Sequence, residues 1–173
     1  HEQLPLEFAK LNKSPIHPIF IHDAIRQGKW KLGKSSKWWL HHSLTKLQSA
    51  YSDQGHTMKL FKGDSLQIID DLVKTCDVKY ILYNKCYELY NRDLEKDIKD
   101  MYSSDHTMKI VPFNGNIMTE PDKILNNQGS HFKVFTPFYK KFISFYEKMR
   151  EPVWIDLSEI PVFIGTNPPS PRD

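Results

Sequence analysis

The sequence predicts an α/β protein built on a parallel β-sheet. Short apolar runs alternate along the chain with segments whose apolar residues recur at helical spacing. Regular alternation of strands and helices favours parallel strands with helices on both faces of the sheet. The four runs expected to form strands are IHPIFIH at 16–22, TMKLF at 57–61, VKYILY at 78–83 and TMKIVPF at 107–113.

Size, charge and cysteine content limit the class of protein. The chain has 173 residues, which is enough for one domain with a real core. Its net charge of +3 is modest, and its Lys and Arg residues are spread along the chain, so nucleic-acid binding by this segment has little support. Cys76 and Cys86 match neither a metal site nor a disulfide framework, and no apolar run reaches membrane-span length. We therefore expect a cytoplasmic protein.

The helices are expected between and beyond the strands. Pro5 suits the first turn of a helix. Asp64 is placed to cap the helix that follows the second strand, and Thr136 to cap a later helix with Pro137 as its first residue. The apolar residues that mark these helices are Leu4, Phe8 and Leu11; Leu66, Ile69, Val73 and Cys76; Leu94, Ile98 and Met101; and Phe138, Phe142, Phe145 and Met149.

The stretch Leu32–Tyr51 predicts a glycine-bearing loop that runs into a helix. Its apolar residues Leu40, Leu44, Leu47 and Tyr51 share one helical face. We expect Ser35 or Ser36 to cap its start and Gly55 to lie in the left-handed conformation just past its end. The Trp38–Trp39 pair, like most of the aromatic residues of 132–146, is expected to pack in the core.

Two local patterns suggest chemistry that their context does not favour. Gly28–Ser35 matches the phosphate-binding loop G-x4-G-K-S, in which Lys34 would bind phosphate and Ser35 a magnesium ion. The first glycine comes several residues after the strand, however, and Trp30 is bulky where backbone would wrap phosphate. His41 and His42 are adjacent on a helix, so they point in different directions and do not suit one metal ion.

Polar residues gather where the expected strands end. In an open parallel sheet, ligands bind outside the carboxyl ends of the strands. Those ends are His22–Asp23, Lys62–Asp64, Asn84–Glu88 and Phe113–Gly115, and the loop Leu32–Ser36 joins the same edge. Asn84 and Glu88 suit the orientation of a ligand, or equally loop hydrogen bonding and the capping of the next helix.

Three stretches together resemble the N-terminal domain of the DNA photolyase/cryptochrome family. They are LGKSSKWWLHHSLTKL at 32–47, LYNKCYELYNRD at 82–93 and KVFTPFY at 133–139, with FKGD at 61–64 and FNGN at 113–116 at the expected joints. The resemblance spans Leu4 to Phe145 and outweighs the phosphate-loop match. It implies a Rossmann-like, doubly wound domain that binds an antenna chromophore: a folate, a deazaflavin or a flavin.

The resemblance also implies which residues bind that chromophore. A flat heteroaromatic ring needs an apolar slot and a few polar groups for its edge. Carried over by motif, those residues are His22, Asp23, Leu32, Gly33, Ser36, Asn84, Cys86 and Glu88. No catalytic residue and no metal ligand is expected in this chain. The family repairs pyrimidine dimers in damaged DNA with FAD bound in a following helical domain, which this chain lacks; photolyase and cryptochrome stay open as readings.

The resemblance predicts two domain-level features. Residues 1–149 correspond to the α/β domain, and the proline-rich residues 150–173 read as a linker toward the FAD domain. The chain begins where the family's first helix begins, so the first strand is missing. That strand is central in a doubly wound sheet. We therefore expect a gap in the sheet, with unpaired backbone on the two strands beside it.

Overall fold

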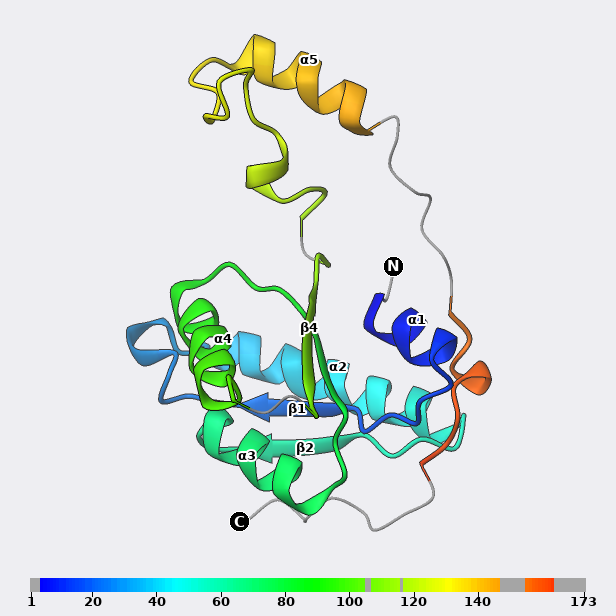
Figure 1. Cartoon of the computed structure of the whole chain (residues 1–173). Coiled ribbons are helices and arrows are strands. Elements are labelled where there is room, and N and C mark those ends of the chain that lie inside the picture. The colour runs from blue at the N-terminus through cyan, green and yellow to red at the C-terminus, as the bar shows by residue number, and fades with distance from the viewer. Residues whose placement is uncertain (1–3, 105–106, 116, 147–154, 164–173) are drawn as a thin grey trace.

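The fold is an alternation of helices with parallel strands (Figure 1). The computed structural model describes residues 4–104, 107–115, 117–146 and 155–163. The elements are α1 Leu4–Leu11, β1 Ile19–His22, η1 Gly28–Trp30, α2 Lys34–Ser52, β2 Lys59–Lys62, α3 Ser65–Thr75, β3 Tyr80–Asn84, α4 Leu89–Met101, β4 Lys109–Phe113, η2 Pro121–Lys123, α5 Phe135–Tyr146 and η3 Leu157–Glu159. The predicted α/β class is confirmed.

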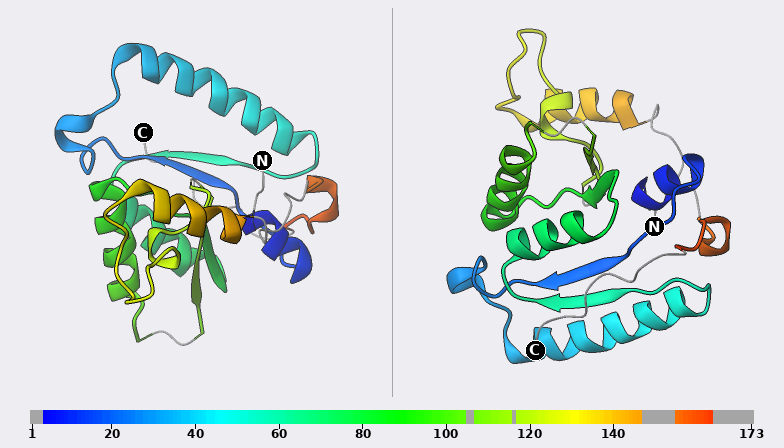
Figure 2. Two further views of the ribbon diagram at one scale, coloured as in Figure 1. Left: turned by 90° about the horizontal axis from the view of Figure 1, so that it is seen from above. Right: turned by 60° about the horizontal axis from the view of Figure 1, so that its bottom comes forward.

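The strands form two separate parallel pairs. β1 pairs with β2, with Ile19 beside Lys59, and β3 pairs with β4, with Tyr80 beside Lys109. No ladder joins β1 to β3 among the described residues. In Figure 1 and in the left view of Figure 2, the β1–β2 pair runs horizontally and β4 runs vertically. The two strand pairs therefore cross at a steep angle. The sheet thus has the gap that the sequence predicts.

Helices lie on both sides of the first strand pair. Seen from above, α2 lies on one side of β1–β2 and α4 on the other (Figure 2, left). The rings of Phe8 on α1 and Tyr80 on β3 pack edge to face with centroids 5.1 Å apart. This two-sided cover is the doubly wound arrangement, in which carboxyl-end loops are left to form a site.

The second strand pair ends the sheet at β4. Lys85 N–H donates to the Phe113 carbonyl, so odd-numbered residues of β4 turn their backbone toward β3. The nitrogen of Pro112, which has no hydrogen to donate, therefore faces the outer edge. Proline is tolerated in a sheet at such an edge position, so Pro112 limits pairing of a further strand on that side.

Some helix ends lie where the sequence predicts them, and others do not. Asp64 caps α3 by accepting from Gln67 N–H at 2.9 Å, and Gly55 has φ +79° past the end of α2, as expected. Ser35 and Ser36 do not cap α2, because Gly33 is the N-cap and both serines lie within the first turn. Likewise α5 begins at Phe135, so Thr136 lies inside it.

Trp38 and Trp39 of α2 and several aromatic residues of α5 are exposed, contrary to expectation. Trp38 and Trp39 are 62% and 69% exposed, because a helix turns about 100° per residue and Trp38 lies nearly opposite the Leu40 face. Helix α5, together with the segment 117–134 beside it, stands apart from the strands in Figure 1. Its rings stack on one another instead, with the Phe135 and Tyr139 centroids 5.5 Å apart. Met149 lies outside the described residues.

Part of the predicted linker packs against the body. His56, 3% exposed, has Nε2 3.0 Å from the Leu157 carbonyl oxygen, and Ile160 is 2% exposed. Lys10 forms an ion pair with Glu159. The domain boundary at 149–150 lies outside the described residues and stays a prediction.

None of the described helices is both long enough and apolar enough to cross a lipid bilayer.

Candidate functional site

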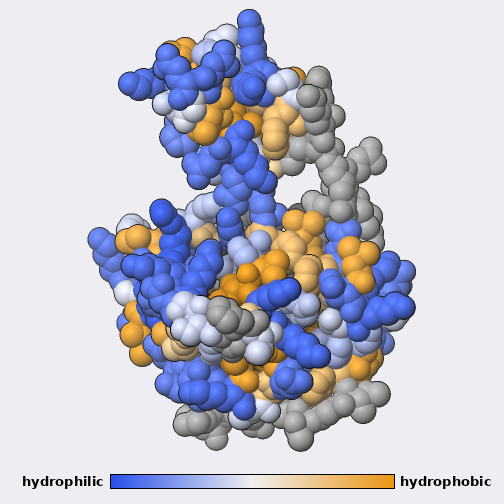
Figure 3. Space-filling model, in the orientation of Figure 1, coloured by the Kyte–Doolittle hydropathy of each residue, from blue (hydrophilic) through white to orange (hydrophobic). Residues whose placement is uncertain are grey.

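A cavity of about 430 Å³ lies between β1 and β3, closed from the sides by α3 and α4. Its body is apolar, with Ile21, Ile69, Leu82 and Ile98 among the lining residues. Figure 3 shows apolar side chains gathered on the molecular face between α4 and α1. Polar residues lie at the end formed by the carboxyl ends of the strands: Asp23, Arg26, Gln27, Asn84, Tyr90 and Asn91. An apolar slot with one polar end suits a flat ring with polar edge groups.

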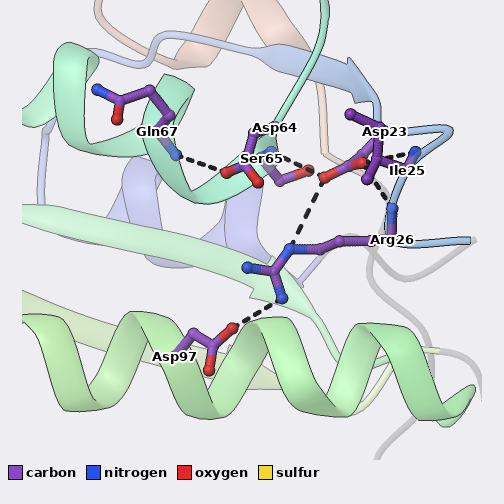
Figure 4. A network of polar contacts seen from close by, with 7 residues as sticks. All are labelled: Asp23, Ile25, Arg26, Asp64, Ser65, Gln67 and Asp97. Atoms are coloured by element: carbon purple, nitrogen blue, oxygen red, sulfur yellow. Dashed lines mark hydrogen bonds and ion pairs between the residues drawn. The ribbon is translucent and has the colours of Figure 1, made fainter.

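Asp23 holds that polar end together (Figure 4). Its carboxylate follows β1, is buried, and accepts from the N–H groups of Ile25 at 3.1 Å, Arg26 at 2.9 Å and Ser65 at 2.8 Å. Burial raises the pKa of this carboxyl, but the hydrogen bonds from Arg26, Ser65 and Ile25 outweigh that effect, so the pKa lies below its usual value. The carboxylate is therefore ionised and fully engaged with the protein.

Arg26 connects Asp23 to helix α4 through ion pairs. Its Nη1 lies 2.7 Å from Oδ2 of Asp97, and its Nε lies 3.8 Å from Oδ2 of Asp23. One guanidinium thus bridges a buried carboxylate after β1 and a more exposed one on α4, as Figure 4 shows. Asp23 therefore positions the loop after β1 rather than presenting a free ligand group, whereas Arg26 Nε is buried without a hydrogen-bond partner among the described residues.

Asn84 is the polar group best placed to meet a ligand. It is the last residue of β3, and its Oδ1 is buried with no hydrogen-bond partner among the described residues. Gly115, after β4, lies against it, since a Cβ at Gly115 would come within 2.4 Å of the Asn84 Cγ. The backbone of Gly115 thus packs closely against the Asn84 side-chain amide, while the Oδ1 of that amide has no hydrogen-bond partner among the described residues. Gln27 Oε1 is in the same condition at this end of the cavity.

The structure brings together three of the eight residues carried over from the resemblance. Asp23, Asn84 and Cys86 line the cavity, and the Cys86 Sγ lies 3.9 Å from the Asn84 carbonyl oxygen. The other five described residues lie outside its lining: His22, Leu32, Gly33, Ser36 and Glu88. Gly33 and Ser36 are exposed at the start of α2, and Glu88 is the exposed N-cap residue of α4, with Oε2 3.0 Å from Nδ2 of Asn91.

The phosphate-loop pattern does not form a phosphate cradle. Gly28 N–H donates to the Ile25 carbonyl and Trp30 N–H to the Gln27 carbonyl, within the 3-10 turn η1. A phosphate loop needs its backbone N–H groups free to surround the anion. The glycines of 28–35 therefore serve local turns.

The cavity includes residues that sequence reasoning missed. Arg26 and Gln27 sit in the loop after β1, and Tyr90 and Asn91 in the first turn of α4. Each follows closely on the carboxyl end of a strand, which is the signal that could have identified them. Burial raises the pKa of Tyr83, and the Glu95 carboxylate of α4 raises it further, so this phenol on β3 stays protonated.

Comparisons with known proteins agree on one family. The model of the DNA photolyase family matches residues 1–153. A deoxyribodipyrimidine photo-lyase of Agrobacterium fabrum is 27% identical over 139 residues, which is 80% of this chain and 28% of that protein. Cryptochrome-1 of Arabidopsis thaliana is 24% identical over 83% of this chain and 21% of its own length.

A solved structure shows the same fold. The crystal structure of a bacterial class III photolyase from Agrobacterium tumefaciens superposes with a TM-score of 0.75 at 24% identity. The match covers 98% of this chain and 34% of that one. The chain thus spans about a third or less of the relatives it matches, and their whole-protein activities do not transfer to it directly.

Proposed function

Because the chain belongs to the DNA photolyase family, we propose that it is an antenna domain, which binds a flat heteroaromatic chromophore at the polar end of the cavity between β1 and β3. The observation that carries the proposal is the pair of buried oxygens without partners, Asn84 Oδ1 and Gln27 Oε1, beside an apolar slot. A buried polar atom without a partner costs free energy. The ring N–H and amino groups of a folate, deazaflavin or flavin are donors that could satisfy these oxygens.

The residues that line the cavity have different roles in binding the chromophore. Asn84 and Gln27 accept from the ring edge, and the apolar residues of the slot cover its faces. Cys86 also lines the cavity. Asp23 accepts from three backbone N–H groups and Arg26 forms its short ion pair with Asp97, so these two residues hold the loop in place. The antenna would supply light absorption and pass excitation energy to FAD in a helical domain of the longer protein.

The partners follow from the same family membership. We propose that the longer protein acts on damaged DNA through its FAD domain, with this domain as the light-gathering part. The relatives include both photolyases and cryptochromes, and the described residues of this chain do not favour one over the other. Repair or photosensing is a property of the longer protein.

An absorption experiment tests antenna binding. The purified chain is mixed in turn with a methylated folate, a deazaflavin and FMN, freed of unbound ligand, and its near-ultraviolet and visible spectrum is recorded. A retained band is expected for one of them. Asn84→Ala should weaken binding about tenfold, because it removes a hydrogen-bonding group.

Matched variants locate the site. Ser36→Ala and Glu88→Ala change two residues of the motif-based set that lie outside the cavity, and both should retain the chromophore. Loss of the band in Ser36→Ala with retention in Asn84→Ala would place the chromophore at the start of α2 and contradict the proposal. A folded chain that retains none of the three candidates would contradict it as well.

A further inference from the structure

Acidic residues are absent from one long stretch of the chain. Residues 24–52 contain six of the 24 Lys and Arg residues and none of the 21 Asp and Glu residues, so this stretch carries +6 and the rest of the chain −3. It comprises the loop after β1, the turn η1 and the helix α2. The modest net charge of the whole chain therefore includes one strongly basic segment.

The lysines of this segment are available to a ligand. Arg26 pairs with Asp97, but the five lysines have no carboxylate partner among the described residues. All five are exposed: Lys29, Lys31, Lys34, Lys37 and Lys46. Cations gathered on one surface without carboxylates between them produce a positive potential, which attracts anions.

Three tryptophan rings lie among these lysines. Trp30 is 73% exposed in η1, and Trp38 and Trp39, in the first turns of α2, are also well over half exposed. The Lys29 Nζ lies 5.3 Å from the centroid of the Trp30 ring, which is a cation–π contact. Three large rings exposed within residues 30–39 are typical of a binding surface rather than of a surface that contacts only water.

Cations and rings share one ridge of α2. Residues four apart on a helix are neighbours, so Lys34, Trp38, His42 and Lys46 form one line, which rises about 18 Å from end to end. The contact between the Trp38 and His42 rings, with centroids 4.4 Å apart, agrees with this arrangement. An extended ligand that carries both charges and flat rings matches such a line.

This ridge faces away from the strands. The opposite face of α2 carries Leu40, Leu44 and Tyr51, which are half-buried, and the Gln48 Nε2 donates to the Met58 carbonyl at 3.1 Å. In the left view of Figure 2, α2 covers β1–β2 from one side, and no other described element lies beyond it. The ridge is therefore open to solvent along its length.

We propose that this surface, the basic aromatic face of η1 and α2, binds single-stranded nucleic acid. The phosphates of the strand meet the lysines, and its bases stack on the tryptophans. Surfaces that bind single strands without sequence preference combine positive charge along the backbone of the strand with aromatic rings for its bases. The bases of a duplex are already stacked on one another, so they cannot use the rings in this way.

The arrangement favours a nucleic acid over an anionic membrane. A helix that lies on a lipid surface has its apolar residues on one face and its cations on the other. The leucine face of α2 is turned toward the strands, and its outward face mixes lysine with tryptophan. Helix α2, which is described in full, therefore has no separate apolar face available to enter lipid.

The basic aromatic face is separate from the proposed chromophore site. None of residues 28–52, all of which are described, lines the cavity between β1 and β3. The proposal also requires neither a DNA lesion nor a flavin, so it differs from the proposed action of the FAD domain. Failure of one experiment therefore leaves the other proposal standing.

An oligonucleotide titration tests the basic aromatic face. The purified chain is titrated with fluorescein-labelled dT and rU strands of about twelve nucleotides, and binding is measured by anisotropy and by quenching of tryptophan fluorescence. Saturable binding with quenching is expected for both strands, which share phosphates and ring faces, and the tighter of the two identifies the natural class. Affinity should fall about twentyfold to a hundredfold between about 50 and 200 mM salt, as for about three to five phosphate contacts.

Matched variants separate stacking from charge. Trp38→Ala should weaken binding about tenfold and leave the salt dependence unchanged, whereas Trp38→Phe keeps a ring and should bind within about threefold of wild type. Lys34→Gln should reduce the slope of log affinity against log salt by about 0.7. Lys140→Gln removes the same charge from an exposed position on α5 and should change neither the affinity nor the slope.

Four outcomes would overturn the proposal. The first is wild-type affinity in Trp38→Ala, which indicates attraction to phosphate without stacking. The second is an equal effect of Lys34→Gln and Lys140→Gln, which indicates a response to net charge alone. The third is tryptophan quenching by a duplex as strong as by the single strand. The fourth is binding to phosphatidylserine vesicles, with a blue shift of tryptophan fluorescence, and none to either oligonucleotide.

Discussion

The Asp23 carboxylate, at the end of β1, accepts a hydrogen bond from the Ser65 N–H, at the start of α3, with 2.8 Å between Oδ2 and N. The two residues are 42 positions apart in the chain. This bond ties the loop after β1 to the turn after β2. Both lie at the sheet edge where the candidate site is formed, so Asp23 determines its shape without facing a ligand.

Removal of that carboxylate should destabilise the protein strongly. Asp23→Ala leaves three backbone N–H groups without their acceptor and removes one of the two carboxylates that pair with Arg26. We expect a loss of about 2–4 kcal/mol in the free energy of unfolding, measured by urea denaturation. The matched control is Asp64→Ala, which removes an exposed helix cap with one acceptor bond and should cost about 1 kcal/mol. Equal losses in the two variants would contradict the central position of Asp23.

The same carboxylate should make stability depend on acid pH. The pKa of Asp23 lies below its usual value in the folded state. A group with a depressed pKa contributes stability above its unfolded pKa of about 3.9, and this contribution is lost as pH falls through the folded pKa. The stability difference between wild type and Asp23→Asn should therefore be constant above about pH 5 and shrink below about pH 4. Parallel pH profiles for the two proteins would exclude this linkage.

Gly115→Ala should disturb the site directly. The added methyl group would lie 2.4 Å from the Asn84 Cγ and 2.8 Å from its Cβ, so the amide must move. We expect a loss of about 1–3 kcal/mol by denaturation, together with weaker chromophore binding. Gly33→Ala is the matched control, because nothing lies within 4 Å of a Cβ there and φ is −69°. A Gly115→Ala protein as stable as the control would show that the contact is not close.

His56 should hold the C-terminal described segment onto the body. Its buried ring pairs with the Leu157 carbonyl at 3.0 Å. His56→Ala should raise hydrogen exchange in residues 155–163 by about fivefold to thirtyfold, from the loss of about 1–2 kcal/mol. Lys10→Ala removes the more exposed ion pair to Glu159 and should change exchange much less. If both variants behave like wild type, other contacts such as those of the buried Ile160 hold the segment.

The fluorescence of the two α2 tryptophans should show that their rings are exposed to solvent. Trp38 and Trp39 are well over half exposed, so acrylamide should quench their fluorescence efficiently in the folded chain. Replacing either by Ala should change stability by less than about 0.5 kcal/mol, as for other surface substitutions. Protection of these rings from quenching in solution would indicate a partner or second copy covering α2.

The sequence by itself determined the elements of this protein. Apolar periodicity located the four strands and five α-helices of the described residues, because burial of one face requires such a pattern whatever the neighbours are. Turn chemistry also acts locally, so Asp64 and Gly55 could be assigned their cap and turn positions. Strand starts moved inward by two or three residues, as at Ile19, because pairing decides where a ladder begins. The gap in the sheet followed from the order of elements in the family.

Only the tertiary structure decided which polar residues meet. Asp23, Asn84 and Cys86 come together at one cavity, whereas Ser36 and Glu88, from the same motifs, do not line it. Sequence motifs record that residues recur together but not the directions in which their side chains point. The exposure of Trp38 and of the α5 aromatics has a similar cause, since burial depends on which surfaces pack across the chain.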